Sequence, residues 1–195
     1  MPELLRLFIG IGAGDTWTDM LSRTAESLRR EAGQSVRWVR PELYHVTVIF
    51  LGNQSPDDVP AIEAALADAA VAAVPFELHL TALHRLGGHE RGALVAGVDD
   101  PTGGLQRFRA TLDAALRERG IAFDARRLVP HVTLGRPRGR SGALSMPTVD
   151  LRDAPHLAVQ TVELVKSELL PGGPRYETLA SVALGDPTAR DRSQP

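Results

Sequence analysis

Two short stretches of the chain carry side chains suited to acid–base chemistry: His45-Val46-Thr47-Val48 and His131-Val132-Thr133-Leu134. Each lies in an apolar run typical of a β-strand, where side chains alternate, so the His and Thr of one tetrad share a face. Because histidine titrates near neutral pH, the two imidazoles could act as general acid and general base in a displacement at phosphorus. The two threonine hydroxyls could then hold the non-bridging phosphate oxygens.

A metal site is the competing interpretation, because histidine is also a common metal ligand. Zinc usually takes three or four protein ligands, commonly histidines at helical spacing or cysteines. The tetrads do not have that spacing, and the sequence contains no cysteine. We therefore predict a site that uses no metal and no other cofactor.

Arginines are concentrated around the second tetrad, and the guanidinium group suits bidentate contacts with phosphate. Arg136 lies on the same predicted strand as His131. Strict alternation would place these two side chains on opposite faces, so Arg136 needs a bulge or the strand end to reach the same face. Gly135 and Pro137 on either side allow such an irregularity. We predict Arg136 as a substrate-binding residue on that basis.

The other histidines and the aromatic residues near the tetrads are expected at the surface or in the core and not in the chemistry. We expect His79 to be a surface or hydrogen-bonded residue, and His84 and His89 to be solvent-exposed in a turn. One aromatic residue near the tetrads could stack a base, but we expect all four of them in the core: Phe8, Trp38, Tyr44 and Phe50.

The elements that must position the tetrads follow from hydrophobic periodicity. Strands are predicted over 4–12, 36–39, 44–51, 76–83, 93–98, 121–123, from 131 onward, 157–169 and 176–184. Helices are predicted over 15–32, 55–72 and 102–119, two of them stopped by Gly33 and Gly120. Residues 142–158 are expected in a loop, and 186–195 in a frayed tail.

The second half of the chain repeats the first with an offset of 86 residues. This shift carries His45 onto His131 and Thr47 onto Thr133, and it also superposes predicted strands and the ends of two helices. One register over several elements indicates internal duplication, with residues 1–185 forming a single bilobal domain. A pseudo-twofold axis would bring the two tetrad strands face to face and aim both histidines at one cleft.

The overall charge and the apolar segments limit how the chain can interact with nucleic acids and membranes. A formal net charge of −2 argues against nucleic-acid binding through bulk electrostatics but leaves room for a local basic patch. The apolar run over 4–11 is too short for a membrane span and lacks the features of a signal peptide. We expect a cytoplasmic, monomeric protein without membrane contact.

These residues resemble the 2H phosphoesterase superfamily, which is named for paired H-x-[ST]-x tetrads. Within it, the chain is most similar to the bacterial and archaeal RNA 2′,3′-cyclic phosphodiesterases, also labelled 2′-5′ RNA ligases. Beside the tetrads, the resemblance rests on six further runs: 6–9, 38–39, 49–52, 130–136, 167–169 and 173–176.

The resemblance implies an α+β fold of two pseudo-twofold-related lobes, with antiparallel sheets around a central cleft and helices outside. It implies hydrolysis of an RNA or oligonucleotide 2′,3′-cyclic phosphate end to a 2′-phosphate. His45 would be the proton donor to the departing O3′ and His131 the proton acceptor from water, while Thr47, Thr133 and Arg136 would hold the phosphate. The division between acid and base rests on the resemblance alone, because a pseudo-twofold makes the two histidines equivalent.

Two other functions would use the same residues. One is an RNA-end ligase that forms or reverses a 2′-5′ phosphodiester. The other is a nucleotide- or RNA-end-binding module without catalysis, and the intact histidine and threonine in both tetrads count against it.

Overall fold

Every strand pairing among the described residues is antiparallel. The structure is a computed structural model that describes residues 3–32, 35–87, 92–138 and 149–186. Its elements in chain order are β1 (Leu5–Gly12), α1 (Gly14–Ala32), β2 (Val36–Trp38), η2 (Pro41–Leu43), β3 (His45–Gln54), η3 (Pro56–Asp58), α2 (Val59–Val71), β4 (Phe76–Leu86), β5 (Ala93–Asp99), α3 (Gly104–Glu118), β6 (His131–Pro137), β7 (Leu157–Val159), β8 (Thr161–Leu170) and β9 (Gly173–Ala183).

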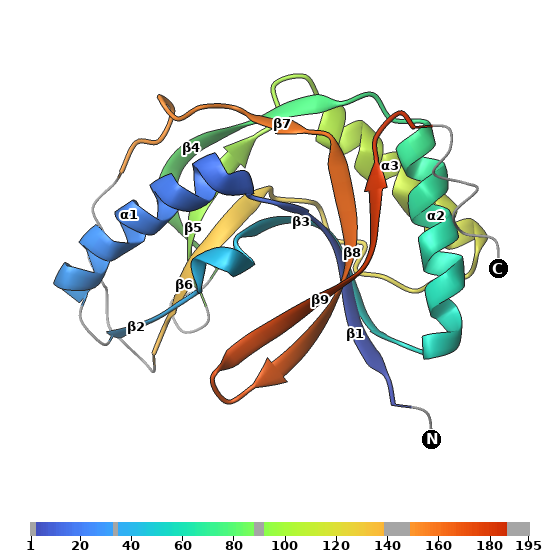
Figure 1. The fold of residues 1–195 in the computed structure, drawn as a ribbon, viewed down its shortest axis with the longest axis horizontal. Coiled ribbons are helices and arrows are strands. Elements are labelled where there is room, and N and C mark those ends of the chain that lie inside the picture. Colours follow the sequence, from blue (N-terminus) through green and yellow to red (C-terminus); the bar gives the residue numbers. More distant parts are fainter. Residues whose placement is uncertain (1–2, 33–34, 88–91, 139–148, 187–195) are drawn as a thin grey trace.

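The strands form one curled sheet in the order β7-β4-β5-β6-β3-β1-β8-β9, and β2 pairs with β6 beside it (Figure 1). The order is symmetric about the central β6–β3 pair. In the sheet, β5 and then β4 lie beyond β6 on one side, and β1 and then β8 lie beyond β3 on the other side. This symmetry is the arrangement that the 86-residue repeat predicts. The assignment of residues 1–185 to one bilobal domain stays a prediction.

The two halves of the sheet meet at a single register pair, Val46 opposite Val132. Both valines are fully buried and belong to the hydrophobic core. Because neighbouring side chains on a strand point to opposite faces, the histidine and threonine on either side of each valine face away from that core. The tetrads are therefore positioned by the burial of the valines between them.

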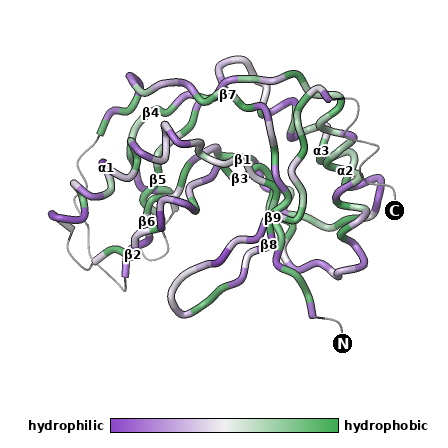
Figure 2. Tube along the Cα trace, in the orientation of Figure 1, coloured by the Kyte–Doolittle hydropathy of each residue, from purple (hydrophilic) through white to green (hydrophobic). Residues whose placement is uncertain are grey.

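α1 lies on one side of the molecule, and α2 and α3 lie together on the other (Figure 1). α1 packs beside β2 and η2, while α2 and α3 pack against each other and reach β8, β9, β3 and β4. Hydrophobic residues gather along the central strands and on α2, whereas α1 and α3 also carry many hydrophilic residues (Figure 2). No helix in the described ranges combines the length and the apolar character needed to cross a membrane.

Three predicted elements differ from the structure. The strand predicted over 121–123 is wrong, since this segment contacts β3 through isolated bonds instead of a ladder. The Asp124 N–H donates to the Phe50 carbonyl at 2.8 Å, and Gln54 Nε2 donates to the Ala122 carbonyl at 2.8 Å. The helix predicted over 55–72 starts with the η3 turn, capped by the Ser55 side chain, before α2 begins.

The strand predicted over 157–169 is two strands. β7 pairs with β4 and β8 pairs with β1, so the chain changes partner at Gln160. Of the predicted loop over 142–158, residues 149–156 form irregular chain with one bridge, between Asp150 and Ala82. Its first part, and residues 187–195 of the predicted tail, lie outside the described residues.

Candidate active site

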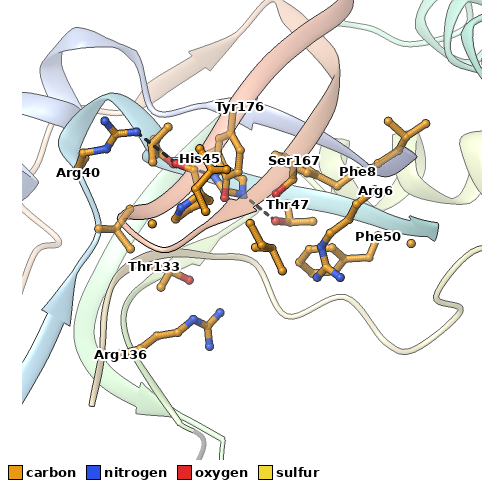
Figure 3. Close-up of a pocket in the computed structure, with 18 of the residues that line it drawn as sticks. Arg6, Phe8, Arg40, His45, Thr47, Phe50, Thr133, Arg136, Ser167 and Tyr176 are labelled. Carbon is orange, nitrogen blue, oxygen red and sulfur yellow. Dashed lines mark hydrogen bonds between the residues drawn. The ribbon is translucent and has the colours of Figure 1, made fainter. Parts of the chain in front are cut away.

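A cleft of about 810 Å³ lies where the two halves of the sheet meet (Figure 3). It brings together all five residues that the tetrad argument singled out: His45, Thr47, His131, Thr133 and Arg136. β3 supplies the first two and β6 the other three. The volume is within the range of small-molecule sites.

Each cleft histidine is oriented by the backbone carbonyl two residues before it. Nδ1 of His45 donates to the Leu43 carbonyl at 2.8 Å, and Nδ1 of His131 donates to the Val129 carbonyl at 2.7 Å. A carbonyl can only accept, so Nδ1 carries the hydrogen in both rings. Nε2 is therefore the atom that gains or loses a proton, and that of His45 lies 3.0 Å from Thr47 Oγ1.

The cleft lowers the pKa of both histidines below the ordinary value of 6.5. For His45 the main cause is burial, and the charge of His131 adds to it, while the hydrogen bond to Leu43 acts in the opposite direction. For His131 burial again dominates, and the Arg136 cation and the nearby His84 lower the pKa further. Both imidazoles are therefore mainly neutral at pH 7 before an anion binds.

The surroundings of the two histidines differ despite the repeat. The ring of His45 lies between Phe8, at a centroid distance of 4.7 Å, and the edge of Tyr176, at 5.4 Å. Burial raises the pKa of the Tyr176 hydroxyl, which therefore stays protonated as a hydrogen-bond donor. His131 has the Arg136 cation nearby instead. One imidazole thus lies in an aromatic setting and the other in a cationic one.

A β-bulge brings Arg136 to the cleft. Leu134 and Gly135 are both buried, so alternation breaks between them. The pairing with β5 shows the same irregularity, because the register passes from Thr133 directly to Gly135 and skips Leu134. Arg136 consequently lies on the same side as His131, as the predicted irregularity requires.

The bulge is repeated in β3, where it brings Phe50 to the cleft. Val48 and Ile49 are both buried, and the register with β1 skips Val48. Phe50 lines the cleft and is 46% exposed, so the expectation that it belongs to the core is wrong. Its position is that of Arg136 under the shift of 86 residues, and this equivalence is the sequence signal that would have identified it.

The other aromatic residues near the tetrads divide between core and cleft. Tyr44 is buried in the core, as predicted. Phe8 is also buried, but its ring lines the cleft beside His45. Trp38 is partly buried against the core and also lines the cleft. The sequence did not identify Tyr176 or Ser167 as cleft residues, because both come from the β8–β9 hairpin, distant from the tetrads in sequence.

The cleft is more basic than the chain as a whole. Among the residues that line it, the charged ones are a single carboxylate, Asp124, and five arginines: Arg6, Arg37, Arg40, Arg126 and Arg136. Hydrogen bonds from Arg126 lower the pKa of Asp124 to about 2, so this carboxylate stays ionised and paired. The excess of cations is a local basic patch in a chain whose net charge is −2.

The other histidines that the structure describes lie away from the cleft lining. His84 is exposed, as predicted, but it lies on β4 and not in a turn, and it packs over Gly97, the residue opposite His131 in the sheet. His79 stacks on His156, and His89 is outside the described residues. Within the described ranges, one group of three side chains could together hold a metal ion, namely Glu77, His79 and His156, and it lies outside the cleft.

Comparison with known sequences supports the resemblance. The profile of the 2′-5′ RNA ligase superfamily matches residues 17–168. An RNA 2′,3′-cyclic phosphodiesterase of Geobacillus stearothermophilus is 29% identical over 164 residues, which are 78% of this chain and 49% of that protein. One of Methanothermobacter thermautotrophicus is 28% identical over 179 residues, 88% of this chain and 95% of that protein. The chain thus spans about half of the first relative and nearly all of the second.

Solved structures share the fold. The protein TT0787 of Thermus thermophilus matches with a TM-score of 0.81 at 25% identity, covering 94% of this chain and all (100%) of that one. Escherichia coli LigT complexed with 3′-AMP matches with a TM-score of 0.73 at 22% identity, with the same 94% and 100% coverage. These likenesses confirm the predicted α+β fold. Because the family profile covers most of the sequence, the chain belongs to the 2′-5′ RNA ligase superfamily.

Proposed function

We propose that this chain is an enzyme that hydrolyses RNA 2′,3′-cyclic phosphate ends to 2′-phosphates by metal-independent acid–base catalysis. The observation that carries the proposal is the pair of cleft imidazoles, each with Nδ1 bonded to a carbonyl and Nε2 left for proton transfer. Membership of the family supports it, as do the relatives named RNA 2′,3′-cyclic phosphodiesterase.

In the proposed reaction, water attacks the cyclic phosphate in line with O3′. Nε2 of His131 takes a proton from this water as the new P–O bond forms. The P–O3′ bond breaks, and O3′ takes the proton from Nε2 of His45. The product carries a 2′-phosphate and a 3′-hydroxyl, and exchange with solvent returns each histidine to its starting state.

The different surroundings of the histidines support this division of roles. Arg136 lowers the pKa of His131, and a general base must be neutral. The pKa of His45 is held down by burial and by His131. An anionic phosphate bound beside His45 counteracts both effects and favours the protonated acid form.

The other cleft residues suit an RNA end. The Thr47 and Thr133 hydroxyls and the Arg136 guanidinium are donors for the non-bridging phosphate oxygens. The exposed ring of Phe50 offers a surface on which a base can stack. The remaining arginines of the cleft suit contacts with further phosphates of an oligonucleotide.

The test is to identify the product. Purified protein is incubated with a nucleoside 2′,3′-cyclic phosphate, and separately with an oligonucleotide ending in one, and ³¹P NMR identifies the phosphate isomer. We expect the 2′-phosphate, at a rate that a metal chelator does not change. A 3′-phosphate would contradict the departure of O3′. Joining of the cyclic end to a 5′-hydroxyl fragment would favour the ligase, and binding without turnover would favour the binding module.

The lowered pKa values predict where the rate depends on pH. In the free protein, activity falls in acid as His131 gains a proton and falls in base as His45 loses one. Since both pKa values lie below 6.5, the profile of kcat/KM is expected to be bell-shaped with its maximum below pH 6.5. The profile of kcat, which reports the bound state, should lie at higher pH because the phosphate raises both pKa values.

Arg136→Gln provides a variant matched to this prediction. Removing the cation raises the pKa of His131 towards its ordinary value, so the acidic limb of kcat/KM should move to higher pH. The alkaline limb, assigned to His45, should stay in place. Steady-state rates across the pH range measure both limbs, and a profile in which neither limb moves would contradict the effect of Arg136 on the pKa of His131.

A further inference from the structure

Two histidines and a glutamate converge beside β7, at an edge of the sheet. The rings of His79 and His156 are stacked, with centroids 3.5 Å apart and planes 16° from parallel. Oε2 of Glu77 lies 3.6 Å from Nδ1 of His156. One ligand atom can be chosen from each side chain such that all three lie within 4.8 Å of one another. None of these residues lines the cleft.

The backbone holds these three positions together. Glu77 and His79 are two residues apart on β4 and share its outer face, because Leu78 between them is fully buried. β7 places Ala158 opposite Glu77, and continuing this antiparallel register places His156 opposite His79. The juxtaposition therefore follows from strand pairing.

A residue of α1 fixes the chain just before His156. The indole Nε1 of Trp17 donates to the Pro155 carbonyl at 2.7 Å, and the Trp17 side chain is 1% exposed. A buried anchor of this kind limits the positions that His156 can take relative to β4. The stacked pair consequently rests on two independent supports, the sheet and α1.

The donor set is that of a transition-metal site. Two imidazole nitrogens with one carboxylate oxygen suit Zn²⁺ and similar ions, whereas Mg²⁺ and Ca²⁺ prefer oxygen ligands alone. Ligand atoms around a tetrahedral zinc are about 3.3 Å apart. Side-chain rotation can bring the three ligand atoms from their present spacing, within 4.8 Å, to this shorter distance. Such rotation is open to Glu77 and His156, because their side chains are 59% and 50% exposed.

We propose that Glu77, His79 and His156 bind a divalent transition-metal ion of the zinc type, at a site separate from the catalytic cleft. The ion joins β4 to the segment that leads into β7, and water completes its coordination. Because such an ion binds the folded chain, it stabilises the fold. The proposal is independent of the reaction assigned to the cleft.

The experiment is a zinc titration of tag-free protein by calorimetry, repeated with Co²⁺ and its visible absorption bands. We expect one saturable Zn²⁺ site per chain that Mg²⁺ does not compete for. Each of His79→Ala, His156→Ala and Glu77→Gln should weaken zinc binding by at least about tenfold. Zinc should raise the Tm of the unaltered protein and should not raise that of His79→Ala.

Matched variants distinguish zinc binding at this site from zinc binding at other histidines. The double variant His45→Ala/His131→Ala removes both cleft imidazoles, and His84→Asn removes an exposed histidine of β4; both should bind zinc as the unaltered protein does. Zinc binding that is lost in the cleft double variant and kept in His79→Ala would overturn the proposal. So would the lack of any saturable zinc binding. Circular dichroism confirms that each variant is folded.

Discussion

Replacing His131 or His45 with alanine is expected to lower kcat on a nucleoside 2′,3′-cyclic phosphate by about 10³-fold, within the range lost with a general acid or base. Each substitution removes an Nε2 that the proposed reaction uses, and methyl side chains cannot replace it. The double variant should be little worse than either single one, since the two groups act in one step. Single-turnover rates, which report the chemical step, are the measurement.

The fold should survive these substitutions, because the buried valine of each tetrad points the other way and is unchanged. His156→Asn is the matched control, as His156 is exposed, does not line the cleft and is not among the groups that shift the pKa of either cleft histidine. Its kcat should stay within about tenfold of the unaltered value, far less than the loss from removing a general acid or base. Full activity in either cleft variant would contradict the proposed function.

Replacing Trp17 with alanine is expected to lower the free energy of unfolding by about 3–5 kcal/mol. The side chain is 1% exposed, so its removal leaves a cavity, and the Pro155 carbonyl loses the indole N–H that it accepts at 2.7 Å. Urea unfolding followed by circular dichroism measures the change. Trp17→Phe keeps a six-membered ring but loses the pyrrole part of the indole and the hydrogen bond, so it should cost less than Trp17→Ala, about 2–3 kcal/mol. A loss below about 1 kcal/mol in Trp17→Ala would show that α1 is held mainly by other residues.

Much of the fold could be predicted because the alternation of apolar residues along the strands and the 86-residue repeat indicate the same arrangement of strands. Alternation in the tetrad strands places Val46 and Val132 in the core, and the observed sheet pairs these two residues. The change of partner at Gln160 could not be predicted, since no glycine or proline interrupts the apolar pattern there. Strand pairing beyond that point depends on tertiary contacts that periodicity does not report.

The site was predictable to the extent that it lies on the repeated strands. Both histidines and both threonines follow from alternation, and Arg136 follows once a bulge is allowed. Phe50 was misplaced because strict alternation was assumed over β3, although the repeat contained the correction. Phe8 and Tyr176 could not be found in this way, since β1 and the β8–β9 hairpin bring them to His45 only in the folded chain.

The single register pair between β3 and β6 lies next to both cleft histidines. A rotation displaces each atom in proportion to its distance from the axis, so atoms next to a pivot hardly move. Were one half to twist against the other about this pair, the adjacent imidazoles would keep nearly the same separation. The tip of the β8–β9 hairpin, whose Leu170 and Gly172 also line the cleft, would swing through a much longer arc (Figure 1). In such a motion the mouth of the cleft would change its width while the spacing of the two proton-transfer groups is preserved.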